Sequence, residues 1–203
     1  MIYTFAAYLL KILLSLFGRL KVEEKDKLPQ SGGFVLACTH TGWIEILWLG
    51  ISILPLKINY MAKKELFDTR FLKWLMHKLN AFPVDRENPG PSTLKIPRRL
   101  LNKGEIVGIF PSGTRTTEEV PLKKGAVTIA AGSNVPIVPA VYIGPANLKD
   151  LFQRKKAGIL FGDAILPDHT LPKKEQAEFM MEKLNEEFEF LHSELLKRLE
   201  KGK

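Results

Sequence analysis

Residues 33–54 read GFVLACTHTGWIEILWLGISIL and carry the strongest indication of how the chain folds. The first six residues form an apolar run, which is typical of a strand buried on both faces of a sheet. The residues from Thr41 onward have the length and the apolar content of a helix. His40 and Glu45 lie around this junction. The stretch therefore predicts a strand and a helix, joined by a turn that carries two titratable side chains.

Apolar segments and helical segments alternate along the rest of the chain. The further predicted strands are 58–62, a short strand that starts at 81, 105–111, 135–143 and 156–166. The further predicted helices are 64–79, 92–102 with Pro97 inside it, 123–133 and 174–203. Strands buried between helices predict an α/β fold with a mixed, largely parallel central sheet flanked by helices.

Two of these helices have an apolar face at helical spacing. In 64–79 the face consists of Phe67, Phe71, Leu75 and Leu79. In the closing helix it consists of Met180, Leu184, Phe188, Leu191, Leu195 and Leu199. Such spacing predicts amphipathic helices.

Composition favours one globular domain with a helical appendage. The 203 residues are 45% hydrophobic and 26% charged, which excludes a disordered chain. Thirty Lys and Arg against 22 Asp and Glu give a net charge of +8, so phosphates, acidic lipid surfaces or nucleic acid are the favoured partners. The single cysteine, Cys38, excludes an internal disulfide and indicates a reducing compartment.

The N-terminus is apolar over residues 1–17 and turns basic at Arg19 and Lys21. A signal peptide would carry its charge before the apolar core, so secretion is disfavoured. As a helix, these residues reach only about 26 Å, against a hydrocarbon core of about 30 Å. We therefore predict an N-terminal amphipathic membrane-associating helix over 1–20, followed by one domain over 21–203.

This helix is expected to lie in the cytoplasmic leaflet, with Lys11, Arg19 and Lys21 near the headgroups. Its expected anchors in the lipid are the aromatic residues Tyr3, Phe5, Tyr8 and Phe17. The alternative is a helix buried against the domain.

The pair His40 and Glu45 has the chemistry of a catalytic base. A His that follows the strand at 33–38 stands at the carboxyl edge of the sheet, where α/β active sites lie. From the first turns of the next helix, Glu45 can reach one imidazole nitrogen and leave the other as a base. No Gly-x-Ser-x-Gly motif supplies a nucleophile, so direct activation of an acceptor hydroxyl is the favoured chemistry. The alternative is a structural His and a solvated Glu.

A second group of residues is suited to a phosphate. The strand at 105–111 runs into Ser112, Gly113, Thr114 and Arg115, which offer hydroxyls, backbone N–H groups and a guanidinium. Further cations are Arg86 after the strand that starts at 81, and Lys63 and Lys64 after 58–62. Each cation taken singly is more often a solvated surface charge.

Four motifs occur together and in order: H-x-x-x-x-E at 40–45, the Arg after FPVD at 82–85, F-P-S-G-T-R at 110–115 and VPIVPA at 135–140. In this order they resemble the four blocks of the glycerolipid acyltransferase family, and the chain is similar to its PlsC-type 1-acylglycerol-3-phosphate acyltransferases. The resemblance covers roughly residues 30–165.

The resemblance implies roles for particular residues. His40 would be the general base, and Glu45 would orient it. The glycerol phosphate would bind to Arg86, Ser112, Gly113, Thr114 and Arg115, with Lys63 or Lys64 as an extra phosphate contact. Val135–Pro139 would shape the acyl-donor side.

The chain departs from the family pattern at two positions. Glu45 stands where the family usually has Asp, and Ser112 stands where the family usually has Glu. The first departure adds a methylene to a contact that depends on distance. The second removes a charge, so a role of Ser112 rests on its hydroxyl. Neither departure removes the base or the arginines.

The implied activity is transfer of an acyl group from an acyl thioester to the sn-2 hydroxyl of lysophosphatidic acid, which gives phosphatidic acid. The thioester, of coenzyme A or acyl carrier protein, is a co-substrate, and we expect neither cofactor nor metal. Expected partners include the anionic lipids of the cytoplasmic face of the cell membrane.

Rival functions are a lysophospholipid acyltransferase for another headgroup and a non-catalytic membrane lipid-binding protein. Nucleic acid is not an expected partner, because no stripe of basic and aromatic residues is present.

Overall fold

The computed structural model describes residues 2–18, 20–40, 42–85, 90–112, 122–153 and 155–201. The strands are β1 Leu20–Glu23, β2 Phe34–Cys38, β3 Ile58–Lys63, β4 Ala81–Val84, β5 Ile106–Ile109, β6 Ile137–Ile143 and β7 Ala157–Phe161. The α-helices are α1 Ile2–Phe17, α2 Ile44–Ser52, α3 Arg70–Lys78, α4 Ser92–Leu101, α5 Gly125–Ser133, α6 Leu148–Phe152 and α7 Lys173–Lys201. Two short 3₁₀ helices are η1 Lys25–Lys27 and η2 Lys64–Phe67.

The strands form one seven-stranded sheet in the order β1-β7-β6-β2-β5-β3-β4. The pairing of β6 with β7 is antiparallel, and the other pairings are parallel. This arrangement confirms the predicted α/β fold with a mixed, largely parallel sheet flanked by helices. Because β2 lies between β5 and β6, its carboxyl end is at the middle of the sheet edge.

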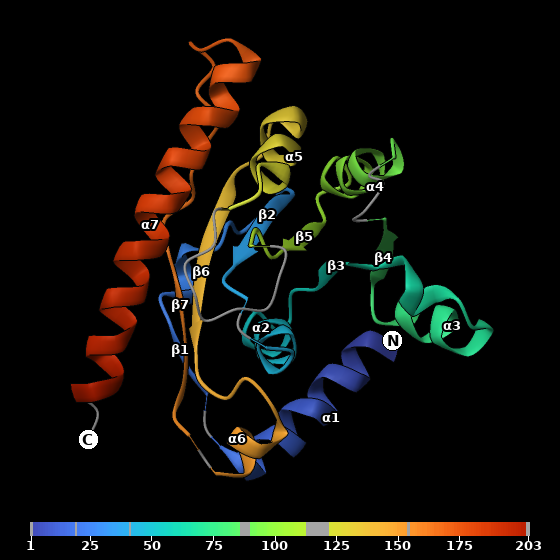
Figure 1. Cartoon of the computed structure of the whole chain (residues 1–203), viewed down its shortest axis with the longest axis vertical. Helices are drawn as coiled ribbons and strands as arrows, with labels where there is room; N and C mark the ends of the chain where they lie inside the picture. The colour runs from blue at the N-terminus through green and yellow to red at the C-terminus, as the bar shows by residue number, and fades with distance from the viewer. Residues whose placement is uncertain are drawn as a thin grey trace.

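Strand β2 explains why its sequence is apolar at every position. Phe34, Leu36 and Cys38 face the core that includes α1 and α2. Val35 and Ala37 face the core on the other side, which includes α5 and α7. All five residues are buried, since helices cover both faces of the sheet (Figure 1).

The predicted helix at 64–79 is wrong in its length. The structure has η2, then a break, then α3, and the side chain of Thr69 caps α3 by accepting a hydrogen bond from the N–H of Leu72 at 3.2 Å. Phe67 is buried, whereas Phe71 of the predicted apolar face is exposed. The break rotates the two segments out of one helical register, so the four residues no longer share a face.

The other predicted elements agree with the structure except at some boundaries. Helix α2 begins at Ile44 rather than near Thr41, which lies outside the described residues. Pro97 lies inside α4, as predicted. Strand β1 and helix α6 were missed; both are short, at four and five residues.

Helix α1 has one face packed on the domain and another face of exposed apolar side chains. It packs against α2, and Leu14 is buried in the core, as in the alternative of a packed helix. Phe5, Ile12 and Leu16 on another face are exposed. Tyr3 does not have the predicted outward position, because its hydroxyl accepts a hydrogen bond from the N–H of Ile58 at 3.3 Å. Of the helices that the structure describes, none has the length and the apolar content needed to span a bilayer.

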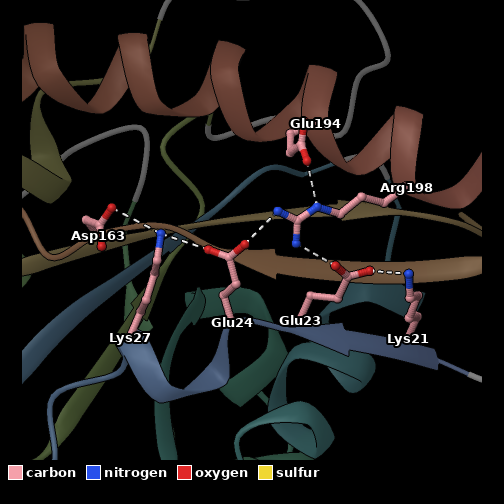
Figure 2. A network of polar contacts seen from close by, with 7 residues as sticks. All are labelled: Lys21, Glu23, Glu24, Lys27, Asp163, Glu194 and Arg198. Carbon is pink, nitrogen blue, oxygen red and sulfur yellow. Dashed lines mark hydrogen bonds and ion pairs between the residues drawn. The ribbon is translucent and has the colours of Figure 1, made fainter.

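A polar network joins the end of α7 to β1 and the residues that follow it (Figure 2). The guanidinium of Arg198 donates to Glu23 at 2.6 Å, pairs with Glu24 at 2.7 Å and donates to Glu194 at 2.8 Å. Lys27 pairs with Glu24 at 2.8 Å and with Asp163 at 3.0 Å. The network thus fixes the closing helix to the edge strand of the sheet.

Candidate active site

His40 lies two residues after the end of β2, at the carboxyl edge of the sheet. Its side chain is almost buried, with 7% of the residue exposed. Its ring lies against the ring of Phe110, with centroids 4.5 Å apart. Phe110 directly follows β5, which pairs with β2, so the two rings meet because their strands end side by side.

Glu45 lies in the first turn of α2 and is completely buried. Its Oε1 is 2.5 Å from Nδ1 of His40. Its Oε2 accepts a hydrogen bond from the backbone N–H of Gly42 at 2.8 Å. The predicted contact between the two side chains is therefore present, and the alternative of a solvated Glu is wrong.

The turn between His40 and Glu45 is fixed against the segment that follows β6. The N–H of Trp43 donates to the carbonyl of Ala146 at 3.3 Å. A Cβ on Gly42 would lie 2.0 Å from that same carbonyl oxygen, so only glycine fits there. The hydroxyl of Thr39 accepts from the N–H of Tyr142 at 3.2 Å. These contacts hold the backbone on both sides of the imidazole.

A pocket of about 920 Å³ opens beside His40. Helices α1 and α2, strand β3 and the ends of η2 and α3 supply most of its walls. Its lining residues are Tyr3, Ala6, Ala7, Leu10, His40, Ile46, Leu47, Gly50, Ile51, Tyr60, Met61, Ala62, Lys63, Leu66, Met76, Leu79, Ala81, Phe110 and Lys123. Most of these side chains are apolar, so the pocket is suited to a hydrocarbon chain, with His40 as a polar group in its wall.

Tyr60 and Cys38 are two other titratable side chains near the pocket, and burial favours the protonated form of both. Burial raises the pKa of the Tyr60 hydroxyl, which donates to the carbonyl of Ile46 at 2.9 Å. Burial and the nearby charge of Glu45 raise the pKa of the Cys38 thiol. Because a thiol that stays protonated is a poor nucleophile, Cys38 is not suited to covalent catalysis.

The cations near His40 are partly those predicted. Lys63 lines the pocket, whereas Lys64 pairs with Asp85 at 2.6 Å. Lys123 also lines the pocket and was missed, although it belongs to the basic segment that follows the third motif. Its backbone N–H donates to the carbonyl of Pro111 at 2.8 Å, which brings it to the end of β5.

Of the five residues that the resemblance assigns to the glycerol phosphate, Ser112 is the one that the structure describes. Ser112 is partly exposed and lies three residues after the end of β5, much as His40 follows β2, so both are at the same sheet edge. The others, Arg86, Gly113, Thr114 and Arg115, lie outside the described residues.

The fourth motif lies in and just before strand β6. Ile137 and Val138 are fully buried in β6, and the carbonyl of Pro139 accepts from the N–H of Gly162 at 2.9 Å. Among the described residues that line the pocket, none comes from Val135–Pro139. The motif thus contributes to the centre of the sheet.

Comparison with known proteins identifies the family of the chain. A family model described as Acyltransferase matches residues 19–143. The chain is 52% identical over 198 residues to the 1-acyl-sn-glycerol-3-phosphate acyltransferase of Bacillus subtilis (strain 168), a match that covers 95% of this chain and 98% of that protein. The identity is 35% to the protein of the same name in Streptococcus pneumoniae, over 96% of this chain and 74% of that protein.

A solved structure has the same fold. The crystal structure of the 1-acyl-sn-glycerophosphate (LPA) acyltransferase PlsC from Thermotoga maritima matches with a TM-score of 0.67 at 20% identity. The match covers 91% of this chain and 78% of that chain. By its family match and its relatives, the chain belongs to the acyltransferase family, among the proteins of the PlsC type that its four motifs resemble.

Proposed function

We propose that this protein is a 1-acyl-sn-glycerol-3-phosphate acyltransferase, which transfers an acyl group from an acyl thioester to the sn-2 hydroxyl of lysophosphatidic acid. The observation that carries the proposal is the contact of His40 with the buried Glu45 in the wall of an apolar pocket. The names of the relatives from Bacillus subtilis and Streptococcus pneumoniae support the same acceptor.

In the proposed mechanism His40 is the general base and Glu45 its positioning partner. Glu45 holds Nδ1, so Nε2 is the nitrogen that takes the proton from the sn-2 hydroxyl. The alkoxide oxygen forms a bond to the thioester carbonyl carbon, and the carbon–sulfur bond then breaks. The proton on His40 passes to the leaving thiolate, which departs as the free thiol of coenzyme A or of acyl carrier protein. The chemistry of these steps needs no resident cofactor.

The acceptor phosphate is proposed to bind on the cationic side of the pocket. Lys63 and Lys123 line this side, and Ser112 follows the neighbouring strand β5. The further proposed contacts are Lys64, Arg86, Gly113, Thr114 and Arg115, as the family motifs imply. Guanidinium and ammonium groups stabilise a phosphate by charge-assisted hydrogen bonds.

The apolar part of the pocket is proposed to hold an acyl chain. Transfer of such a chain out of water is favourable in proportion to the apolar area that is buried. Helix α1 forms one wall, and its exposed residues Phe5, Ile12 and Leu16 are proposed to rest in the cytoplasmic leaflet. In this arrangement the lysolipid reaches His40 without leaving the membrane surface.

The direct test is release of free thiol from an acyl-CoA series when lysophosphatidic acid is added. We expect thiol release and formation of phosphatidic acid in equal amounts. A panel of other lysophospholipids separates this enzyme from an acyltransferase for another headgroup, which would prefer a different acceptor. A lipid-binding protein without catalysis would release no thiol with any acceptor.

A further inference from the structure

Helix α3 presents two aromatic side chains to solvent. Phe71 is 67% exposed and Trp74 is 50% exposed. Their rings stack with centroids 6.3 Å apart and an angle of 29° between the planes. None of the residues of α3 is buried. Because water contact with so much apolar area is unfavourable, this face is suited to a partner that covers it.

The same helix carries only positive charge. Its sequence is RFLKWLMHK, in which Arg70, Lys73 and Lys78 are exposed cations and no acid is present. The nearest acids in the sequence, Glu65 and Asp68, precede the helix. On a helix with 3.6 residues per turn, Lys78 lies on the same stripe as Phe71 and Trp74, whereas Arg70 and Lys73 lie beside Trp74 on the side away from Phe71. The exposed face is therefore an aromatic pair with cations beside it, which we call the α3 face.

Helix α3 also borders the proposed active site. Met76, on its inner side, lines the pocket that contains His40, and so does Leu79 directly after the helix. Helix α1 lines the same pocket from another side with Ala7 and Leu10.

The N-terminal end of α1 and the C-terminal end of α3 lie close together, since Ile2, Tyr3, His77 and Lys78 line a second, smaller hollow of about 370 Å³. Both helices lie on the side of the molecule away from α7 (Figure 1).

We propose that the α3 face is a second membrane-binding element, which inserts Phe71 and Trp74 into the headgroup region of an anionic leaflet. The proposal rests on the proposed function in so far as that function includes a membrane location, and it adds an element beyond α1. Tryptophan is favoured at the boundary of headgroups and acyl chains, and lysines beside it attract anionic lipid. With α1 and α3 both on the leaflet, the pocket between them opens directly to the lipid.

The charge and the side-chain types of the α3 face together favour an anionic leaflet as the occupant. An anionic leaflet provides phosphates for Arg70, Lys73 and Lys78, and an interfacial layer for the two rings. Helix α1, which has an exposed apolar side, and helix α3 line the same pocket. This arrangement favours one extended surface, a bilayer, over a small partner.

The test is binding of the full chain to vesicles of phosphatidylglycerol and phosphatidylcholine, measured by flotation without acyl donor or acceptor. The variant Phe71→Ser/Trp74→Ser is expected to lose about tenfold or more in partitioning. The variant Lys73→Gln/Lys78→Gln is expected to lose about 25-fold on anionic vesicles, at about fivefold per lysine, and little on pure phosphatidylcholine. Matched controls are Phe190→Ser, an aromatic residue of α7 that is 60% exposed, and Lys103→Gln/Lys197→Gln.

Fluorescence locates the contact. Emission of the wild type is expected to shift to shorter wavelength on anionic vesicles, and the shift is expected to disappear in Trp74→Phe, which keeps an aromatic ring. Equal partitioning of the Phe71→Ser/Trp74→Ser and Phe190→Ser variants would overturn the proposal, as would an unchanged shift in Trp74→Phe. Since these measurements involve no turnover, their failure is distinct from a failure of the thiol-release test.

Discussion

Gly42 and Glu45 are joined by a hydrogen bond of 2.8 Å from the backbone N–H of the glycine to Oε2 of the carboxylate. The second oxygen of the same carboxylate contacts Nδ1 of His40 at 2.5 Å. The buried Glu45 is therefore fixed through both of its oxygens. A carboxylate held in this way orients the imidazole and stabilises the positive charge that the ring gains when it takes a proton.

The first prediction concerns the base itself. His40→Ala is expected to lower kcat by about 10² to 10⁴, because general-base catalysis contributes about this much. The far-UV circular dichroism is expected to stay that of the wild type. The control is His192→Ala, since His192 is an exposed residue of α7 on the other side of the sheet. Near-normal turnover of purified His40→Ala would remove His40 from the proposed mechanism.

The second prediction concerns the turn that holds Glu45. Gly42→Ala places a methyl group 2.0 Å from the carbonyl oxygen of Ala146, so the turn has to move and the N–H of residue 42 leaves the carboxylate. We expect kcat to fall at least tenfold with little change in KM for the acyl thioester, and we expect a loss of about 1–3 kcal/mol in the free energy of unfolding.

The matched control for this substitution is Gly125→Ala, because a Cβ on Gly125 meets nothing within 4 Å. Steady-state kinetics and urea unfolding of the two variants make the comparison. A Gly42→Ala enzyme with the kcat of the Gly125→Ala enzyme would show that the hydrogen bond to Glu45 has no part in turnover.

The sequence was sufficient to predict the position of the His and Glu pair, for a local reason. An apolar run buried on both faces is recognisable as a central strand, and β2 is such a strand. His40 and Glu45 are separated only by one turn, so their contact depends on short-range geometry. Strand β5 was predictable for the same reason, and with it the location of Ser112 at the same edge.

Features that depend on distant packing were not predictable. The break between η2 and α3 depends on the cap by Thr69, which competes with the continuous apolar spacing of 64–79. Tyr3 faces the protein because its hydroxyl meets the N–H of Ile58, 55 residues away. Lys123 lines the pocket through its backbone contact with Pro111, which no periodicity indicates.

The third prediction concerns the phosphate of the acceptor. Lys123→Gln is expected to raise KM for lysophosphatidic acid about tenfold, because a charge-assisted contact contributes on the order of 1.5–3 kcal/mol. The values of kcat and of KM for the acyl donor are expected to change little. Steady-state kinetics at several salt concentrations check this, with Lys103→Gln as the exposed control. An equal rise in KM for both substrates would contradict a specific contact with the acceptor.

The fourth prediction concerns the network between α7 and β1 (Figure 2). Burial alone would raise the pKa of Glu23, but hydrogen bonds from Lys21 and Arg198 outweigh it and lower the pKa below the ordinary 4.5. Hydrogen bonds from Lys27 and Arg198 likewise lower the pKa of Glu24, against a smaller effect of burial. Carboxyl groups with lowered pKa stabilise the fold above pH 4.5, and this contribution is lost as the pH falls through their folded-state values.

Arg198→Gln is therefore expected to lower the free energy of unfolding at pH 7 by about 1 kcal/mol, since these partly solvated pairs are screened. For a chain of this size the melting temperature falls by about 2–4 °C. The difference from the wild type should shrink as the pH falls below 4.5 and through the lowered folded-state pKa values of the two glutamates. Thermal unfolding at pH 7 and at pH 3.5 measures it, with Lys197→Gln as the exposed control on the same helix. A deficit of equal size at both pH values would mean that Arg198 stabilises the fold by packing instead of by its ion pairs.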